Sequence, residues 1–478
     1  MSILNYEEEL TLRVKEEKAT VELIKIVSDL WLDKQIELVL FRRQLRDSKM
    51  SEILSLFDYA RDFVKKPISI YEALEAAQVI YNGNYGASKI DLGKLVYNCE
   101  DKSKLSEEIA SALNGFEAES NDNVHGKDVV LYGFGRIGRL LARELIMQAG
   151  KGDQLRLRAI VVRNDSDEQI IKRAALLRTD SVHGEFPGTV IEDFENKALV
   201  INGHHVQLIK ASNPEDVDYT AYDIKDALVL DNTGVFTDKA ALSRHLEGKG
   251  VSKVILTAPG KEIPNIVFGA NHLEYKVEDY DIFSAASCTT NAITPMLKVV
   301  NDNFGVEKGH IETVHAYTND QNLVDNMHKK NRRGRAAALN MVITSTGAGK
   351  AVVKVIPSLD GKLTANAVRV PTPDGSLAIL NINLEKATNL DEFSETMRKA
   401  ALEGALVEQI EFNMSKELVS TDIVGNAAAS IYDSNATIVS KDGKSVVIYA
   451  WYDNEYGYSR QVMRLAKYVA NVRRKTNY

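Results

Sequence analysis

The sequence Val129-Val130-Leu131-Tyr132-Gly133-Phe134-Gly135-Arg136-Ile137-Gly138 joins a short apolar run to a Gly-x-Gly-x-x-Gly loop. Apolar residues at helical spacing follow over 140–146, and a second apolar run at 155–162 ends before Asn164-Asp165. This order of strand, glycine loop, helix, strand and acid is typical of a dinucleotide-binding unit, in which the glycines let a pyrophosphate approach the helix N-terminus. The stretch therefore predicts a Rossmann-type parallel sheet.

Two regions on either side of this unit have a different character. Beyond residue 288, predicted strands at 311–316, 367–370, 377–384 and 445–452 outnumber the helices, which favours a mixed α+β domain. Residues 1–125 read as a mainly α-helical extension, with a capping box at Ser69 and Glu72 and no catalytic constellation. We therefore expect an α/β chain with an extension at 1–125, a cofactor domain at 126–287 and a catalytic domain at 288–453.

Composition narrows the class of protein. The chain has 478 residues, a formal net charge of −8 and 44% apolar residues, and its pI is near 5.7. An acidic chain does not bind nucleic acid through bulk electrostatics. Only two cysteines are present, which is typical of a reducing compartment, and no apolar run is long enough to cross a membrane. We expect a cytoplasmic protein without membrane or nucleic-acid partners and without a metal.

Cys288 stands where a predicted strand gives way to a predicted helix, among the polar residues Ser287, Thr289, Thr290 and Asn291. A lone cysteine is more often a small buried apolar residue. Four hydrogen-bonding neighbours and a helix N-terminus instead favour a reactive thiol with a lowered pKa. His315, at a predicted strand end, is a candidate base for that thiol, although a structural role for a single histidine is the plainer alternative.

Hydroxyl and guanidinium groups downstream suit phosphate oxygens. Each alone is more often a surface residue. The candidates are Thr318, Arg333, Arg335, Ser345, Thr346, Gly347 and Arg369.

Six motifs in order resemble the glyceraldehyde-3-phosphate dehydrogenase family. The resemblance extends from about residue 127 to 478, and its motifs are 133–139 (Gly-Phe-Gly-Arg-Ile-Gly-Arg), 287–291 (Ser-Cys-Thr-Thr-Asn), His315, 345–348 (Ser-Thr-Gly-Ala), 369–373 (Arg-Val-Pro-Thr-Pro) and 451–458 (Trp-Tyr-Asp-Asn-Glu-Tyr-Gly-Tyr).

The resemblance implies a phosphorylating oxidation of glyceraldehyde 3-phosphate by a homotetramer, through a thioester on Cys288 with His315 moving protons. It assigns Thr318 and Arg369 to the substrate phosphate, and Ser287, Thr289, Arg333, Thr346 and Gly347 to inorganic phosphate, with Arg335 close enough to share that role. Cofactor contacts are implied for Gly133, Phe134, Gly135, Arg136, Ile137, Gly138, Asp165, Thr257 and Asn454. Residues 454–478 are expected to return as a helix to the cofactor domain.

Several departures from the family pattern bear on the cofactor. Arg163 replaces a usual aliphatic residue, and Ser212-Asn213-Pro214 replaces an Arg-Asp-Pro-like stretch. Asp165 favours NAD because it would repel a 2′-phosphate, whereas Arg163 would offset that repulsion and admit NADP. We expect NAD, with NADP possible.

Other functions stay open at this point. A related enzyme oxidises erythrose 4-phosphate by the same thiol chemistry, and a non-catalytic scaffold acting through residues 1–125 is an alternative of another class. The extension itself has three possible roles: regulation or assembly, docking of another enzyme, or a helical cap over apolar surface. The resemblance fits the glycolytic and the gluconeogenic direction alike.

Overall fold

The computed structural model describes residues 5–118 and 126–478. The chain divides into two compact units. The first comprises Met1–His125, Gly150–Gly152 and Arg473–Tyr478, and the second comprises Gly126–Ala149 and Asp153–Val472. The α/β class expected from the sequence is confirmed, with parallel strands in the sheets of both units.

The first unit is mainly helical but contains a small sheet. Its α-helices are α1 (Tyr6–Asp29), α2 (Met50–Tyr59), α3 (Ile70–Asn82), α4 (Leu92–Asn98) and α5 (Leu105–Ala112). The capping box predicted at the start of α3 is confirmed, because Ser69 Oγ accepts from Glu72 N while Glu72 Oε2 accepts from Ser69 N. The sheet has the order β2 (Arg43–Gln44), β1 (Ile36–Leu40), β3 (Ser88–Asp91), β22 (Lys475–Asn477).

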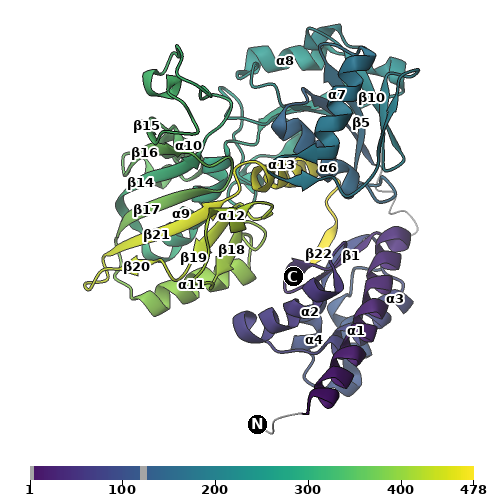
Figure 1. Cartoon of the computed structure of the whole chain (residues 1–478). Coiled ribbons are helices and arrows are strands. Elements are labelled where there is room, and N and C mark those ends of the chain that lie inside the picture. Colours follow the sequence, from purple (N-terminus) through teal and green to yellow (C-terminus); the bar gives the residue numbers. More distant parts are fainter. Residues whose placement is uncertain (1–4, 119–125) are drawn as a thin grey trace. The chain divides into compact units, whose positions relative to one another are not determined.

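Strand β22 comes from the end of the chain and corrects the expected helix at 454–478. The helix α13 spans only Tyr456–Val469. It ends because Asn471 adopts a left-handed conformation with φ of 54°. The last residues then run parallel to β3 as a strand of the first unit. Figure 1 shows β22, in yellow, beside the purple elements of that unit.

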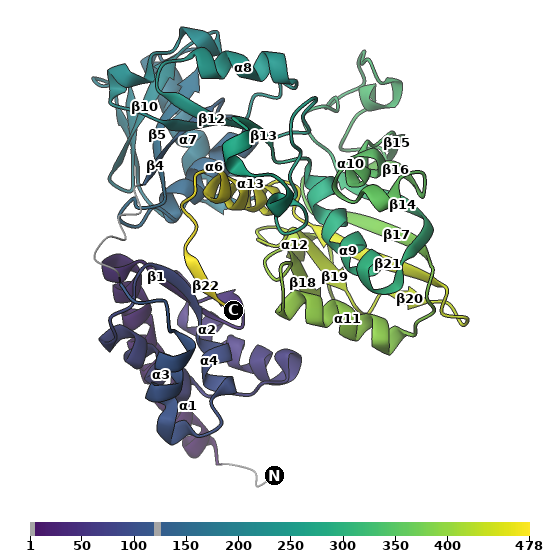
Figure 2. The same cartoon turned by 180° about the vertical axis from the view of Figure 1, so that it is seen from behind.

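The second unit is built on two sheets. In the first sheet, six parallel strands are followed by two antiparallel ones in the order β13 (Ile282–Ser284), β12 (Val251–Leu256), β11 (Ala227–Asp231), β4 (Lys127–Tyr132), β5 (Leu155–Val162), β10 (His204–Lys210), β9 (Ala198–Ile201), β8 (Val190–Asp193). This is the parallel sheet that the opening motif predicts. Figure 2 shows it from behind.

Helices cover both faces of this sheet. Helices α6 (Arg136–Met147), α7 (Asp167–Arg178) and α13 contribute to one apolar core. Helix α8 (Lys239–Glu247) lies over the other face, where Leu242 packs with Val229 and Val254. The continuous burial of β11 explains its unbroken apolar sequence, since both faces of the strand are covered.

The second sheet is mixed. Its order is β15 (Val342–Thr344), β16 (Leu363–Val370), β14 (Val306–Ala316), β17 (Ser376–Leu384), β21 (Ser445–Tyr452), β19 (Ser430–Asp433), β18 (Ile410–Asn413), with β20 (Ile438–Val439) paired to β21. Helix α9 (Cys288–Phe304) follows directly after β13 of the first sheet. The catalytic candidates therefore stand where the chain passes from one sheet to the other.

Candidate active site

Cys288 is the first residue of α9. Ser287 is the N-cap, and its Oγ accepts a hydrogen bond from Thr290 N at 3.0 Å. Asn291 anchors the turn by donating from Nδ2 to the backbone oxygen of Ala285 at 2.8 Å. The polar neighbours that mark Cys288 in the sequence thus build the helix start that presents the thiol.

His315 faces the thiol from strand β14. Its Nε2 lies 3.6 Å from Cys288 Sγ, and its Nδ1 lies 2.7 Å from the backbone oxygen of Ala316. The second contact requires the proton on Nδ1. Nε2 then carries a lone pair toward the thiol, so His315 can accept the proton of Cys288.

Arg369 of β16 is the register partner of His315. Its Nη1 donates to the oxygen of Ala316 at 2.6 Å and lies 3.0 Å from His315 Nδ1. Burial and the positive charge of Arg369 lower the pKa of His315 to about 3. The imidazole is therefore neutral at physiological pH, as a base must be.

The thiol differs from its prediction. The helix N-terminus favours a lowered pKa, but burial raises the pKa of Cys288, and the charge of Arg369 offsets this only in part. Burial at this position desolvates a thiolate. The free-energy cost of that desolvation exceeds the stabilisation of the thiolate by the helix N-terminus. A thiol in this state would need a base to act as a nucleophile, and His315 Nε2 is the acceptor that faces it at 3.6 Å.

One cavity of about 310 Å³ joins these residues to most of the predicted phosphate ligands. Of those ligands, its lining includes Ser287, Thr289, Arg333, Thr346, Gly347 and Arg369, together with Cys288 and His315. Thr318 and Arg335 do not line it. Arg335 instead pairs with Asp325 at 2.8 Å on the surface, and its role at the phosphate site stays a prediction.

Two features of this cavity were missed in the sequence. Lys330 lines it and adds a cation to the phosphate region; a lysine in a basic run gave no separate signal. Arg333 is ion-paired with Asp320, and its Nε donates to Thr344 Oγ1 at 3.0 Å. Its guanidinium is thereby held in place but partly neutralised.

The glycine loop has the geometry that its sequence requires. Gly133 has φ of 95°, and a Cβ on Gly138 would lie 2.6 Å from the oxygen of Gly133. Gly135 is the N-cap of α6, and Ile137 lies in its first turn. Gly133 and Phe134 also line a second cavity of about 360 Å³ at the end of β5.

The other predicted cofactor residues lie around the same sheet edge. Arg136 pairs with Asp180 at 3.0 Å and also with Glu455, so its guanidinium is committed to the protein. Asp165 follows β5, and Thr257 Oγ1 donates to the oxygen of Asp231 at 2.9 Å. Neither Asp165 nor Thr257 lines the second cavity.

Asn454 is buried and oriented. Ser376 Oγ donates to its Oδ1 at 2.6 Å and in turn accepts from Ala316 N at 3.0 Å. The Nδ2 group of Asn454 therefore remains available to donate to a ligand. This chain of hydrogen bonds connects Asn454 to the strand that carries His315.

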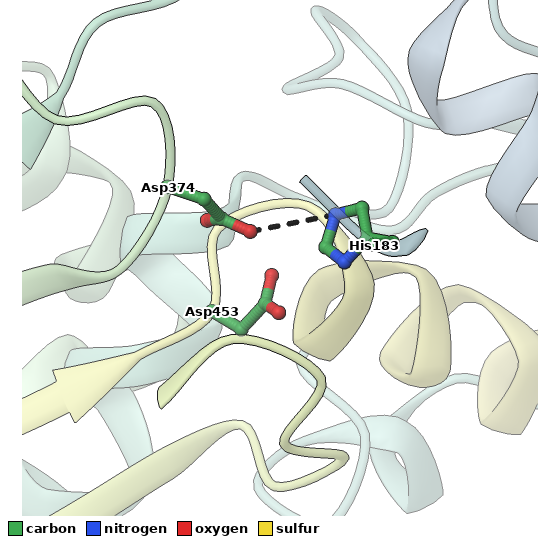
Figure 3. Close-up of side chains that lie close together, drawn as sticks. All are labelled: His183, Asp374 and Asp453. Carbon is green, nitrogen blue, oxygen red and sulfur yellow. Dashed lines mark ion pairs between the residues drawn. The ribbon is translucent and has the colours of Figure 1, made fainter. Parts of the chain in front are cut away.

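A buried acid cluster lies beside Asn454. Figure 3 shows His183, Asp374 and Asp453 together, with His183 Nε2 3.4 Å from Asp374 Oδ2. Asp374 Oδ1 accepts from Asn454 N at 3.2 Å. Burial and the charge of Asp453 raise the pKa of Asp374 to about 9.

Among the described residues these three form the only group with ligand atoms close enough for a metal ion, within 4.8 Å of one another. Backbone N–H groups satisfy both oxygens of Asp453 but only Oδ1 of Asp374, whose Oδ2 has no hydrogen-bond partner in the part of the chain that the structure describes. Asp453 accepts from the N–H groups of Glu455 and Tyr456 at the start of α13 and from Gly425 N. We interpret the cluster as a buried acid pair that supports Asn454.

Over the described residues, the structure contains no helix of the length and apolarity that crossing a membrane requires.

Two family models match separate parts of the second unit. Residues 127–239 match the family model "Glyceraldehyde 3-phosphate dehydrogenase, NAD binding domain", and residues 287–454 match "Glyceraldehyde 3-phosphate dehydrogenase, C-terminal domain". A glyceraldehyde-3-phosphate dehydrogenase of Ogataea parapolymorpha is 41% identical over 346 residues, covering 72% of this chain and 98% of the relative. Glyceraldehyde-3-phosphate dehydrogenase 4 of Caenorhabditis elegans is 41% identical over 345 residues, with the same coverage.

One relative matches far more of the chain. A glyceraldehyde-3-phosphate dehydrogenase-like protein of Pseudomonas aeruginosa (strain UCBPP-PA14) is 48% identical over 457 residues, covering 94% of this chain and 98% of the relative. A match of that extent includes most of the residues that precede the NAD binding domain. The N-terminal extension is therefore shared with another protein of this kind.

Proposed function

Because the chain belongs to the glyceraldehyde-3-phosphate dehydrogenase family, we propose that it oxidises glyceraldehyde 3-phosphate and phosphorylates the product, forming 1,3-bisphosphoglycerate. NAD supplies the hydride acceptor, and inorganic phosphate is the second substrate. The observation that carries this proposal is the 3.6 Å approach of Cys288 Sγ and His315 Nε2 in a cavity lined by Arg333 and Arg369.

The first step uses the neutral thiol and the neutral imidazole. As Cys288 Sγ forms a bond to the aldehyde carbon, the thiol proton passes to His315 Nε2, which returns it to the carbonyl oxygen, giving a hemithioacetal and a neutral imidazole. Loss of a hydride from that carbon and of the hydroxyl proton to His315 leaves a thioester on Cys288. A phosphate oxygen then attacks the thioester carbon, and the sulfur leaves and is reprotonated.

The cations of the cavity fit two phosphates. Arg369 projects beside His315, and Arg333 and Lys330 lie in the same lining with the hydroxyls of Ser287, Thr289 and Thr346. Guanidinium and hydroxyl groups are the common ligands of phosphate oxygens. We assign Arg369 to the substrate phosphate and Arg333, Thr346 and Gly347 to the attacking phosphate. Thr318, outside this lining, completes the substrate site in our proposal.

Asn454 orients the nicotinamide in this proposal. Ser376 occupies its Oδ1, so its Nδ2 donates to the carboxamide oxygen of the cofactor. Gly133, Phe134, Gly135, Ile137 and Gly138 receive the pyrophosphate at the start of α6, and Asp165 the adenosine ribose. Arg136 and Thr257 shape the same edge through contacts with the protein itself.

We also propose an oligomeric state and a cellular location for the enzyme. The segment 323–343 exposes Leu323, Met327, Leu339 and Met341, and Met327 is 92% exposed. Such a patch fits contacts between copies of the chain in a homotetramer. We place the enzyme in the cytoplasm, in glycolysis or gluconeogenesis.

A steady-state assay of the full-length protein tests the proposal by NADH absorbance. We expect turnover of glyceraldehyde 3-phosphate that depends on inorganic phosphate, and its near-complete loss in Cys288→Ala. Cys99→Ser is the matched control, since Cys99 is buried in the first unit and donates to the oxygen of Asp101. Phosphate-independent activity on erythrose 4-phosphate would favour the related enzyme, full activity of Cys288→Ala would exclude Cys288 as the nucleophile, and absence of turnover by wild type would favour a scaffold.

A further inference from the structure

The cavity beside the glycine loop carries two guanidinium groups. It is lined by Gly133 and Phe134 of the loop, by Arg163 directly after β5, by Arg173 of α7 and by Ser212 after β10. In a Rossmann unit the pyrophosphate lies at the glycine loop and the adenosine ribose lies at the end of the second strand. Arg163 and Arg173 therefore stand where the 2′ position of the ribose is bound.

Neither arginine is neutralised by an ion pair among the described residues. Arg163 is exposed at the cavity, and Arg173 donates from Nη1 to the backbone oxygen of Gln169 at 3.0 Å. Two nearby arginines, in contrast, have carboxylate partners: Arg158 of β5 pairs with Asp128 at 3.1 Å, and Arg178 of α7 pairs with Glu192 at 2.6 Å. The cavity thus keeps positive charge that no ion pair among the described residues offsets.

Asp165 opposes this charge but does not cancel it. Burial lowers the pKa of Arg173, and the negative charge of Asp165 acts against that shift, so the two groups interact. Asp165 is not part of the cavity lining, whereas both arginines are. Two guanidinium groups therefore face the ribose site against one carboxylate at its edge.

We propose that Arg163 and Arg173 form a binding site for the 2′-phosphate of NADP, so that the protein uses NADP as well as NAD. Guanidinium groups bind phosphate through paired charge-assisted hydrogen bonds, and the Ser212 hydroxyl adds a neutral donor at the same cavity. The proposal rests on the proposed function only in taking this cavity as the adenosine end of a nicotinamide cofactor.

Calorimetric titration of the full-length protein with NAD, NADP, adenosine 2′,5′-bisphosphate and 5′-AMP tests it without turnover. We expect the Kd for NADP to lie within about tenfold of that for NAD. Arg163→Gln should weaken NADP about tenfold, and Arg163→Gln with Arg173→Gln more, since each variant removes a charged hydrogen bond. The Kd for NAD should change by less than about twofold in both variants.

Arg178→Gln is the matched control, because Arg178 belongs to the same helix as Arg173 but lies outside the cavity. It should leave the NADP to NAD ratio unchanged. Arg163 is exposed, so its replacement does not threaten the fold. The proposal is overturned if wild type binds NADP a hundredfold or more weaker than NAD, or if the arginine variants weaken both cofactors equally. A cavity that binds both cofactors in a protein without dehydrogenase activity would refute only the proposed function.

Discussion

Arg369 and His315 lie side by side on the paired strands β16 and β14, with Arg369 Nη1 3.0 Å from His315 Nδ1. Both groups use the backbone oxygen of Ala316 as an acceptor. This arrangement puts a permanent positive charge next to the base and close to the nucleophile. It therefore acts on the protonation of both catalytic candidates.

Arg369→Gln should make Cys288 less acidic. The positive charge of Arg369 lowers the pKa of a thiol that burial raises, so its removal leaves the thiolate less stabilised. We expect the midpoint of iodoacetamide alkylation of Cys288 to shift to higher pH. Rates measured between about pH 5 and 10 by mass spectrometry check this.

The control for that shift is Arg158→Gln, which removes an arginine paired with Asp128 on the other sheet. Its alkylation profile should coincide with that of wild type. An unchanged or lowered midpoint in Arg369→Gln would show that the guanidinium does not set the acidity of the thiol.

Replacing His315 should affect the rate rather than substrate binding. His315→Asn removes the acceptor that faces Cys288 Sγ, so we expect kcat to fall by about 10²–10⁴ with little change in the KM for NAD. His310→Asn is the control, because His310 lies on the same strand but is exposed and contacts Glu312. Equal losses in the two variants would point to a structural effect on β14.

Asp374→Asn should stabilise the protein increasingly as pH rises. The folded state holds the Asp374 proton up to about pH 9, whereas the unfolded chain releases it near the ordinary value of 3.8. Between these values the unfolded state binds fewer protons, so the wild-type protein loses stability with increasing pH. An asparagine at position 374 has no proton to release, so this loss of stability with pH is absent. Its side-chain oxygen can still accept from Asn454 N.

The measurement is the difference in Tm between variant and wild type across about pH 5 to 9. The neighbouring ionisable groups, His183, Asp453 and Glu455, are the same in both proteins. A difference that stays constant across this range would show that Asp374 is already ionised in the folded protein.

The end of the chain should stabilise the first unit. Trp31 lies between two guanidinium groups, with Arg46 and Arg474 each 4.2 Å from its ring. We expect Arg474→Ala to destabilise this unit by about 0.5–2 kcal/mol, and deletion of 473–478 to cost more because β22 also pairs with β3.

Fluorescence of Trp31 during urea unfolding, in a Trp451→Phe background, reports on that unit because the chain has only two tryptophans. Arg61→Ala is the control, since Arg61 forms exposed ion pairs with Asp58 and Asp62 and should be nearly neutral. Identical unfolding of wild type and the deletion variant would contradict a role for the chain end.

The local sequence pattern was sufficient to predict much of the cofactor domain. Residues 129–138 require a strand, a positive-φ turn and a helix start, and β4 and α6 follow that order. The local sequence pattern predicts the first unit less completely. There, β1 and β22 belong to one sheet although their segments come from opposite ends of the chain. Strand pairing over such a separation leaves no local signal, so a helix was expected where β22 lies.

The sequence by itself determined the parallel sheet and marked Cys288 and His315 as the candidate nucleophile and base, because periodicity, glycines and polar neighbours act within a few residues. Only the tertiary structure decided the charge state and the partners of these groups. Burial raises the pKa of Cys288, Asp320 pairs with Arg333, and Asp325 pairs with Arg335. Solvation and ion pairing depend on which segments meet in space, and so they cannot be inferred from the order of residues along the chain.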